Sequence, residues 1–108
     1  MDKLNEEKAQ ELKDKYGDVY RLSSENDEGD MLYFYFRKPT RPDLARFAQE
    51  LSKDLLKSTN NLVYGCLVAP DVEEVKKMAV EKPGMILALG GELQKLIGSN
   101  MDFLAEKL

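Results

Sequence analysis

The sequence predicts an α+β fold in a single domain, with an N-terminal helix, a β-hairpin and then a block of about four short helices. Three observations lead to this prediction. Residues 31–37 are rich in aromatic side chains, which suits a strand and cannot present a narrow helical stripe. Pro39 breaks that strand, and apolar residues at helical spacing follow from residue 41. A length of 108 residues suits one domain and leaves little room for two.

The first segment, residues 1–17, is predicted to be a peripheral helix over residues 2–16. Its apolar stripe is thin and lies among charged residues. The stripe consists of Leu4, Ala9, Leu12 and Tyr16. Gly17 follows as a helix stop. So thin a stripe indicates a helix that packs on the outside of the domain.

The second segment, residues 18–38, reads as a hairpin. The predicted strands are residues 18–22 and 31–37, and the polar, turn-forming residues 23–30 connect them. Strand geometry divides the second strand into two faces. The predicted core face holds Leu32, Phe34 and Phe36, and the other face holds Tyr33, Tyr35 and Arg37.

The third segment, residues 40–98, is the predicted helical block. Thr40 and Asp43 are placed to cap a helix over about residues 41–57, with Pro42 in its first turn. Its expected core stripe is Leu44, Phe47, Ala48, Leu51 and Leu55. The polar residues 58–61 are predicted to break the chain after this helix.

The run of residues 62–69 suits either a buried strand or a short buried helix, and periodicity does not decide between them. Polar cap residues before it favour the helix. Two further helices are predicted at about residues 71–80 and 84–97, the second ended by Gly98. The tail, residues 99–108, is expected to add a short helical turn through Met101, Phe103 and Leu104.

The composition excludes several function classes. There is no histidine, so neither a Ser-His-Asp triad nor a His-ligated metal site can form. A single cysteine cannot make an internal disulfide or a thiolate zinc cluster. A net charge of −4 and a pI near 4.9 argue against binding to nucleic acid or an anionic membrane. We therefore expect no catalytic residues, no cofactor and no metal.

The first residues are polar and charged, and no apolar run approaches the roughly 20 residues that span a bilayer. The lone Cys66 agrees with a reducing compartment. These features predict a cytoplasmic protein.

Three smaller features have structural interpretations. Gly90 and Gly91 lie inside a helix pattern and indicate a close approach between helices; a flat patch for a partner's backbone is the alternative. Cys66 is predicted to be buried and inert. The acids of residues 27–30 lack the spacing of a calcium loop and are predicted to form a solvated turn.

Charge is distributed unevenly: residues 1–30 carry −5, residues 31–60 carry +3 and residues 61–108 carry −2. The positive group surrounds the strand-to-helix junction and lies beside a tyrosine-rich face. This combination predicts a protein-interaction site whose residues are Tyr20, Tyr33, Tyr35, Arg37, Lys38 and Arg41. The structural alternatives are a tyrosine face covered by the first helix and a hydrated basic junction with Arg46.

Three runs resemble small phage and prophage proteins of the tail assembly chaperone family. They are residues 34–44 (FYFRKPTRPDL), 60–71 (NNLVYGCLVAPD) and 83–93 (PGMILALGGEL). The resemblance covers about residues 18–98. It implies a non-enzymatic cytoplasmic factor of a bacterial host that binds the tape-measure or tail-tube protein during assembly. The family supplies no catalytic residues.

Two other readings compete with this one. A small regulatory or inhibitor-type adaptor would bind a host or phage protein through the edge of the hairpin. A small enzyme that uses carboxylates and lysines would instead need a pocket of converging acids. Pairing of hairpins between two copies is a further expectation, because an exposed tyrosine face favours self-association.

Overall fold

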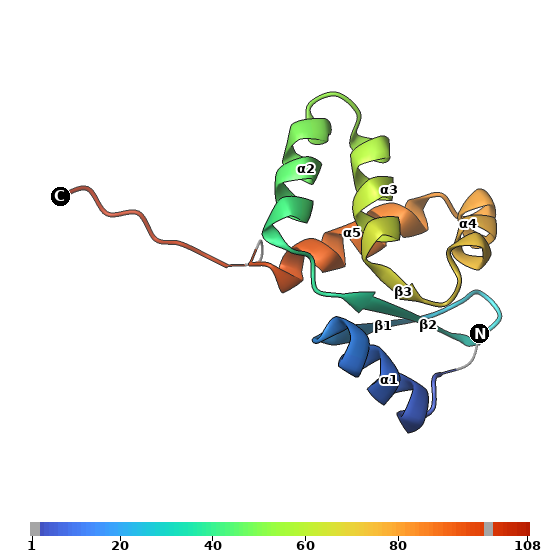
Figure 1. Ribbon diagram of the computed structural model, residues 1–108. Helices are drawn as coiled ribbons and strands as arrows, with labels where there is room; N and C mark the ends of the chain where they lie inside the picture. The colour runs from blue at the N-terminus through green and yellow to red at the C-terminus, as the bar shows by residue number, and fades with distance from the viewer. Residues whose placement is uncertain (1–2, 99–100) are drawn as a thin grey trace.

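The computed structural model describes residues 3–98 and 101–108, and its element order confirms the predicted α+β architecture (Figure 1). A helix precedes an antiparallel hairpin, and four helices follow. A third, short strand is added between two of those helices. The elements are α1 Glu6–Tyr16, β1 Val19–Glu25, β2 Met31–Arg37, α2 Arg41–Leu51, α3 Leu55–Cys66, β3 Leu67–Ala69, α4 Val72–Glu81 and α5 Gly84–Leu96.

The sheet has the order β1-β2-β3, and both of its strand pairs are antiparallel. The hairpin is longer than predicted, because β1 runs to Glu25 and only residues 26–30 form the turn. The Asn26 side chain holds that turn by accepting the backbone N–H groups of Glu28 and Asp30. These two side-chain hydrogen bonds therefore hold the turn together where the strands no longer pair.

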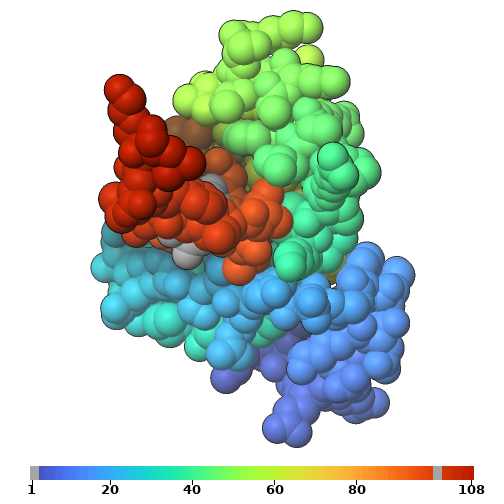
Figure 2. Space-filling model, turned by 90° about the vertical axis from the view of Figure 1, so that its left-hand side faces the viewer, coloured from blue at the N-terminus to red at the C-terminus, as the bar shows by residue number. Residues whose placement is uncertain are grey.

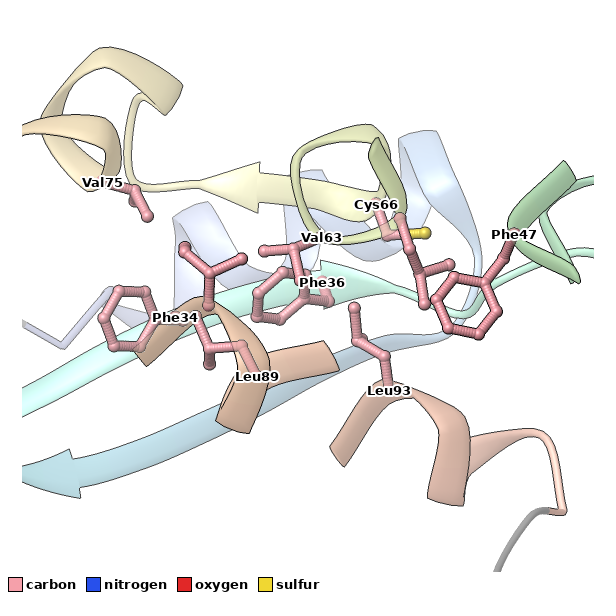
Figure 3. Close-up of a cluster of buried hydrophobic side chains, with 10 residues drawn as sticks. Phe34, Phe36, Phe47, Val63, Cys66, Val75, Leu89 and Leu93 are labelled. Atoms are coloured by element: carbon pink, nitrogen blue, oxygen red, sulfur yellow. The ribbon is translucent and has the colours of Figure 1, made fainter. Parts of the chain in front are cut away.

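The core lies on one face of the sheet, between β2 and the helices (Figure 3). Phe34 and Phe36 are buried, as the strand pattern predicted, and point toward α3 and α5. Phe47 of α2 lies beside Leu93 of α5 at the other end of the cluster. The remaining buried members are Leu62, Val63, Cys66, Val75, Ile86 and Leu89.

The N-terminal helix α1 lies on the opposite face of the sheet from α2, α3 and α5 (Figure 1). Asn5 caps it by accepting the backbone N–H of Lys8, and Gly17 ends it at φ +80°. None of its residues is buried, so its predicted peripheral position is confirmed. The prediction of a helix from residue 2 is wrong at its start, because residues 3–5 are not helical; residue 2 lies outside the described residues.

The prediction of one helix over residues 41–57 followed by a break at 58–61 is wrong. The chain turns at residues 52–54 instead, where Asp54 accepts the backbone N–H of Lys57 and caps a new helix. Ser58 and Thr59 lie buried inside α3. Their hydroxyls can be buried there because both donate to the carbonyl oxygen of Leu55. The hydroxyl groups of Ser58 and Thr59, which suggested a polar break, thus form their hydrogen bonds within the helix.

The undecided run 62–69 contains both structures. Its first five residues end α3, and its last three form β3, so the helix favoured for the whole run is wrong for Leu67–Ala69. The leucines of the predicted α2 stripe are also not core. Only Phe47 of that stripe is buried, while Leu44, Leu51 and Leu55 are 41–53% exposed. The reason is that α2 packs mainly on α3 at one end of the core, so that Phe47 alone of this stripe reaches the buried cluster.

The helices predicted at about residues 71–80 and 84–97 are confirmed as α4 and α5. The tail is not helical over its described residues, 101–108, which extend away from the body (Figure 1). A segment this short forms a helix only when packing stabilises it, and its apolar side chains are exposed. Within residues 3–98 and 101–108, no helix is long and apolar enough to cross a membrane.

Candidate functional site

A groove of about 590 Å³ lies between strand β1 and helix α5. Side chains of the core cluster and its margin form its apolar floor. These floor residues are Leu22, Leu32, Phe34, Met85 and Leu89, and the exposed Ala88 adjoins them. Charged residues of both signs surround the floor. They are Arg21, Glu25, Lys82 and Glu92. The groove can therefore accept a segment that is apolar on one side and polar on the other.

One wall of the groove is the free edge of the sheet, because β1 is the first strand in the order β1-β2-β3. The hydrogen bonds from Asn26 N–H to the Asp30 carbonyl and from Lys38 N–H to the Asp18 carbonyl set the register of the hairpin. Antiparallel strands bond through alternate residues, so residues 20, 22 and 24 bond to β2. The backbone groups of Val19, Arg21, Ser23 and Glu25 therefore point away from β2. In the described part of the chain, no strand pairs with this edge.

The other wall is α5, and a glycine sets how closely it packs. A Cβ atom placed on Gly90 would lie 2.6 Å from Cγ2 of Thr59, so α5 packs tightly on α3 at this point. The predicted close helix approach is thereby confirmed for Gly90. A Cβ atom at Gly91 would meet nothing within 4 Å. With α5 held against α3 by this contact, Met85, Ala88 and Glu92 line the groove toward β1.

An ion pair between the hairpin turn and the C-terminal end of α4 lies at one end of the groove. Lys82 Nζ lies 2.7 Å from Oδ2 of Asp27. This hydrogen bond lowers the pKa of the exposed Asp27 carboxyl. A second hollow of about 270 Å³ borders the groove here and shares Leu32, Lys82 and Met85 with it.

The predicted tyrosine face is largely covered. Tyr35 is only 6% exposed, and its hydroxyl oxygen accepts the backbone N–H of Leu4 at 3.0 Å. The N-terminal segment thus covers Tyr35, which offers almost no exposed surface, and its role as an interaction residue stays a prediction. The alternative, a tyrosine face covered by the first helical segment, holds for this residue. Tyr33 is half-buried, with the Arg21 guanidinium 5.8 Å from its ring centroid.

Tyr20 does not lie beside Tyr33 and Tyr35. It pairs with Phe36 in the hairpin register, and paired residues share a face, so Tyr20 lies on the core side of the sheet. The hairpin register therefore separates the three predicted tyrosines onto two faces. They do not form one surface.

The basic junction is partly a structural feature. Arg37 donates to both carboxylate oxygens of Asp43, at 2.7 and 3.3 Å, and to the Gly65 carbonyl at 3.0 Å. The Arg37 hydrogen bond lowers the pKa of Asp43 to about 2. Lys38 and Arg41 are exposed, as an interaction site requires. Of the predicted basic residues, Arg37 joins β2 to α2 and α3, and the other two face solvent.

Cys66 lies in the core near this junction and is 1% exposed. Burial raises the pKa of its thiol to about 11, so the thiol is neutral at physiological pH. The prediction of a buried cysteine is confirmed. Over the residues that the structure describes, no group of three acidic, cysteine or histidine side chains is placed to hold a metal ion.

Sequence reasoning missed the groove because it forms only where helix α5 packs beside the hairpin. It also missed β3, which pairs with the other side of β2, so that β1 and β3 are the two edge strands of the sheet. The only available signal was the β-branched and apolar end of the run 62–69, directly before Pro70. Neither wall of the groove carries a motif that marks it as a site.

Comparison with known proteins gives a family and one similar structure. The family model described as a domain of unknown function, DUF6848, matches residues 12–106. The chain is similar to the solved structure of the uncharacterised protein rbstp2171 from Bacillus stearothermophilus. The two share 32% sequence identity with a TM-score of 0.78, over 91% of this chain and 99% of that one. No curated protein matches the chain.

Proposed function

Since the chain belongs to the DUF6848 family, whose function is unknown, we propose from its own geometry that it is a non-enzymatic protein-binding factor. It holds an extended segment of a partner protein in the groove between β1 and α5. The observation that carries this proposal is the free edge of β1 beside an apolar floor. Such an edge is a ready template for one more strand.

Strand addition divides recognition between backbone and side chains. The backbone groups of Val19, Arg21, Ser23 and Glu25 give hydrogen bonds to any extended segment. Alternate side chains of that segment then enter the floor at Leu22 and its apolar neighbours. The preferred partner is therefore a segment with alternating apolar residues, and its exact sequence matters less.

The partner class follows from the resemblance of residues 34–44, 60–71 and 83–93 to phage tail assembly chaperones. We propose the tape-measure or tail-tube protein as the partner and the cytoplasm of a bacterial host as the place of action. The resemblance implies that such a factor keeps these subunits soluble until assembly. An edge that pairs with exposed strands suits this task.

Two observations support a role without catalysis. The groups whose pKa shifts most are Asp43 and Cys66, and neither lines the groove. Each shift has a structural cause, an ion pair with Arg37 for Asp43 and burial for Cys66. Perturbed groups at a catalytic site would instead converge in the main cleft.

The test is co-expression of the chain with a phage tape-measure protein and a phage tail-tube protein, followed by affinity capture. Two variants block the groove in different ways. Ala88→Arg places a long charged side chain over the apolar floor, and Ser23→Pro removes one edge N–H. Ala45→Arg, at an exposed position of α2 outside the groove, is the matched control.

We expect the unaltered chain and Ala45→Arg to capture the partner. Each groove variant should capture about tenfold less, which corresponds to a loss of 1.4 kcal/mol. Capture of a host enzyme in place of a tail protein would favour the regulatory adaptor. Equal capture by all four chains would overturn the groove as the binding site.

A further inference from the structure

The C-terminal tail, residues 101–108, exposes apolar side chains that the rest of the chain does not cover. Met101 is 61% exposed, Phe103 is 85% exposed and Leu104 is 87% exposed. The backbone forms neither helix nor strand and extends away from the body (Figure 1). Figure 2, which faces this end of the molecule, shows the tail projecting from the surface. An extended apolar segment of this kind lacks only a strand to pair with.

In a second copy of the protein, the free edge of β1 is such a strand. The edge strand has seven residues and the tail has eight. At about 3.3 Å per residue, both span roughly 25 Å. One tail can therefore pair with the whole of one edge.

We propose that the tail of one copy adds as a strand to β1 of a second copy and places its apolar side chains in the β1–α5 groove. The exchange is reciprocal, so two tails fill two grooves and the assembly closes as a symmetric dimer. This inference goes beyond the proposed function, because it assigns an occupant to the groove in the absence of any other protein.

The side-chain pattern of the tail fits the groove. In an extended strand, Met101, Phe103, Ala105 and Lys107 share one face, and Asp102, Leu104, Glu106 and Leu108 share the other. The first face, with Met101 and Phe103, matches the apolar floor around Leu22 and Met85. The acids of the second face lie on the side of Arg21, which pairs with Tyr35 and so faces away from the core. The face with Met101 and Phe103 is therefore the one that enters the groove.

The direction of the tail selects a second copy over its own groove. The groove lies along the first turns of α5, from Gly84 to Glu92. The tail leaves beyond the opposite end of that helix and continues outward, which gives the molecule a long axis of 53 Å against 32 and 26 Å. In this direction, the apolar residues can reach only another molecule.

The test is the mass of the purified chain by sedimentation equilibrium, without any partner protein, so its outcome is independent of the proposed function. Phe103→Asp with Leu104→Asp disables the tail in the full chain, and Ala88→Arg blocks the groove. Val80→Asp, at an 84% exposed position of α4 outside the groove, is the matched control. We expect dimers for the unaltered chain and for Val80→Asp, and a dissociation constant raised at least about tenfold for the two others.

A mixture of the two disabled chains distinguishes exchange between copies from folding back. The tail variant keeps an intact groove and the groove variant keeps an intact tail, so the mixture should form a heterodimer with a single tail in place. A monomeric unaltered chain would overturn the proposal. A dimer that persists in both variants, or a mixture that stays monomeric, would overturn it equally.

Discussion

Gly90 on α5 and Thr59 on α3 lie so close that a Cβ atom at residue 90 would stand 2.6 Å from the Thr59 methyl group. Thr59 is buried, and its hydroxyl donates to the Leu55 carbonyl, so its side chain cannot turn away without losing that bond. The contact fixes the distance between the two helices and, with it, the position of one wall of the groove.

Replacing this glycine therefore tests the helix contact. Gly90→Ala should destabilise the fold by about 1–3 kcal/mol, because overpacking outweighs the better helix propensity of alanine. The matched variant Gly91→Ala should instead stabilise it by up to about 1 kcal/mol, because no atom lies within 4 Å of its new methyl group. Urea unfolding measures both. Adding Thr59→Ser should restore stability to Gly90→Ala, and no rescue would contradict the contact.

The Arg37–Asp43 ion pair predicts a pH dependence of stability. The pKa of Asp43 is about 2 in the folded chain against an ordinary 3.8, so the unfolded chain binds the proton first as the pH falls. The resulting stabilisation, about 2 kcal/mol, is fully present above about pH 5 and is lost as the pH falls toward 2. Asp43→Asn should remove it at pH 7 and flatten the profile between pH 5 and 2. An unchanged profile in urea titrations of the variant would refute the assignment, and Asp102→Asn in the exposed tail is the control.

The edge of β1 predicts opposite outcomes for two neighbouring serines. Ser24→Pro removes an N–H that bonds to β2 and should cost at least about 1 kcal/mol, with a lower melting temperature. Ser23→Pro removes an N–H that points away from β2, and we expect a smaller loss. Thermal unfolding of both variants gives the comparison. Equal losses would show that the register or the free edge is misassigned.

The covered tyrosine predicts a local effect. Tyr35→Phe removes the hydroxyl that accepts the Leu4 N–H, so the N-terminal segment should lose about 1 kcal/mol of attachment. Hydrogen exchange should then accelerate at the Leu4 amide with little change in the core. Tyr33→Phe is the control, because Tyr33 lies on the same strand without that bond. An equally protected Leu4 amide in both variants would contradict the contact.

Local patterns were sufficient for the types of most elements, though not for the strand β3. Three such patterns act within a few residues of the chain, so the sequence alone predicts their effect. They are the capping box of Thr40 and Asp43, the alternation of Leu32, Phe34 and Phe36, and the glycine after Tyr16. The end of α2 was not readable in this way. Asp54 competed with the polar residues 58–61 as the cap, and the burial of Ser58 and Thr59 in the fold, with Thr59 against Gly90 of α5, decided the choice.

The candidate site was less accessible to sequence reasoning than the fold. Residue type alone grouped Tyr20, Tyr33 and Tyr35, yet the hairpin register separates them and the N-terminal segment covers Tyr35. The groove depends on contacts between residues far apart in the chain, such as Lys82 with Asp27. No local pattern reports such contacts, because they form only when the helices pack on the sheet.

By itself, the sequence determined a histidine-free α+β chain with an N-terminal helix, an aromatic hairpin and a helical block, since composition and periodicity are local properties. The tertiary structure alone decided that β1 is the free edge, that α5 faces it across a groove and that the α2 leucines remain exposed. The physical reason is that segments far apart in the sequence pack against one another in the fold. This packing decides which strand lies at an edge and which apolar face is covered. The three-residue strand Leu67–Ala69 illustrates this, because it pairs with β2 and not with β1.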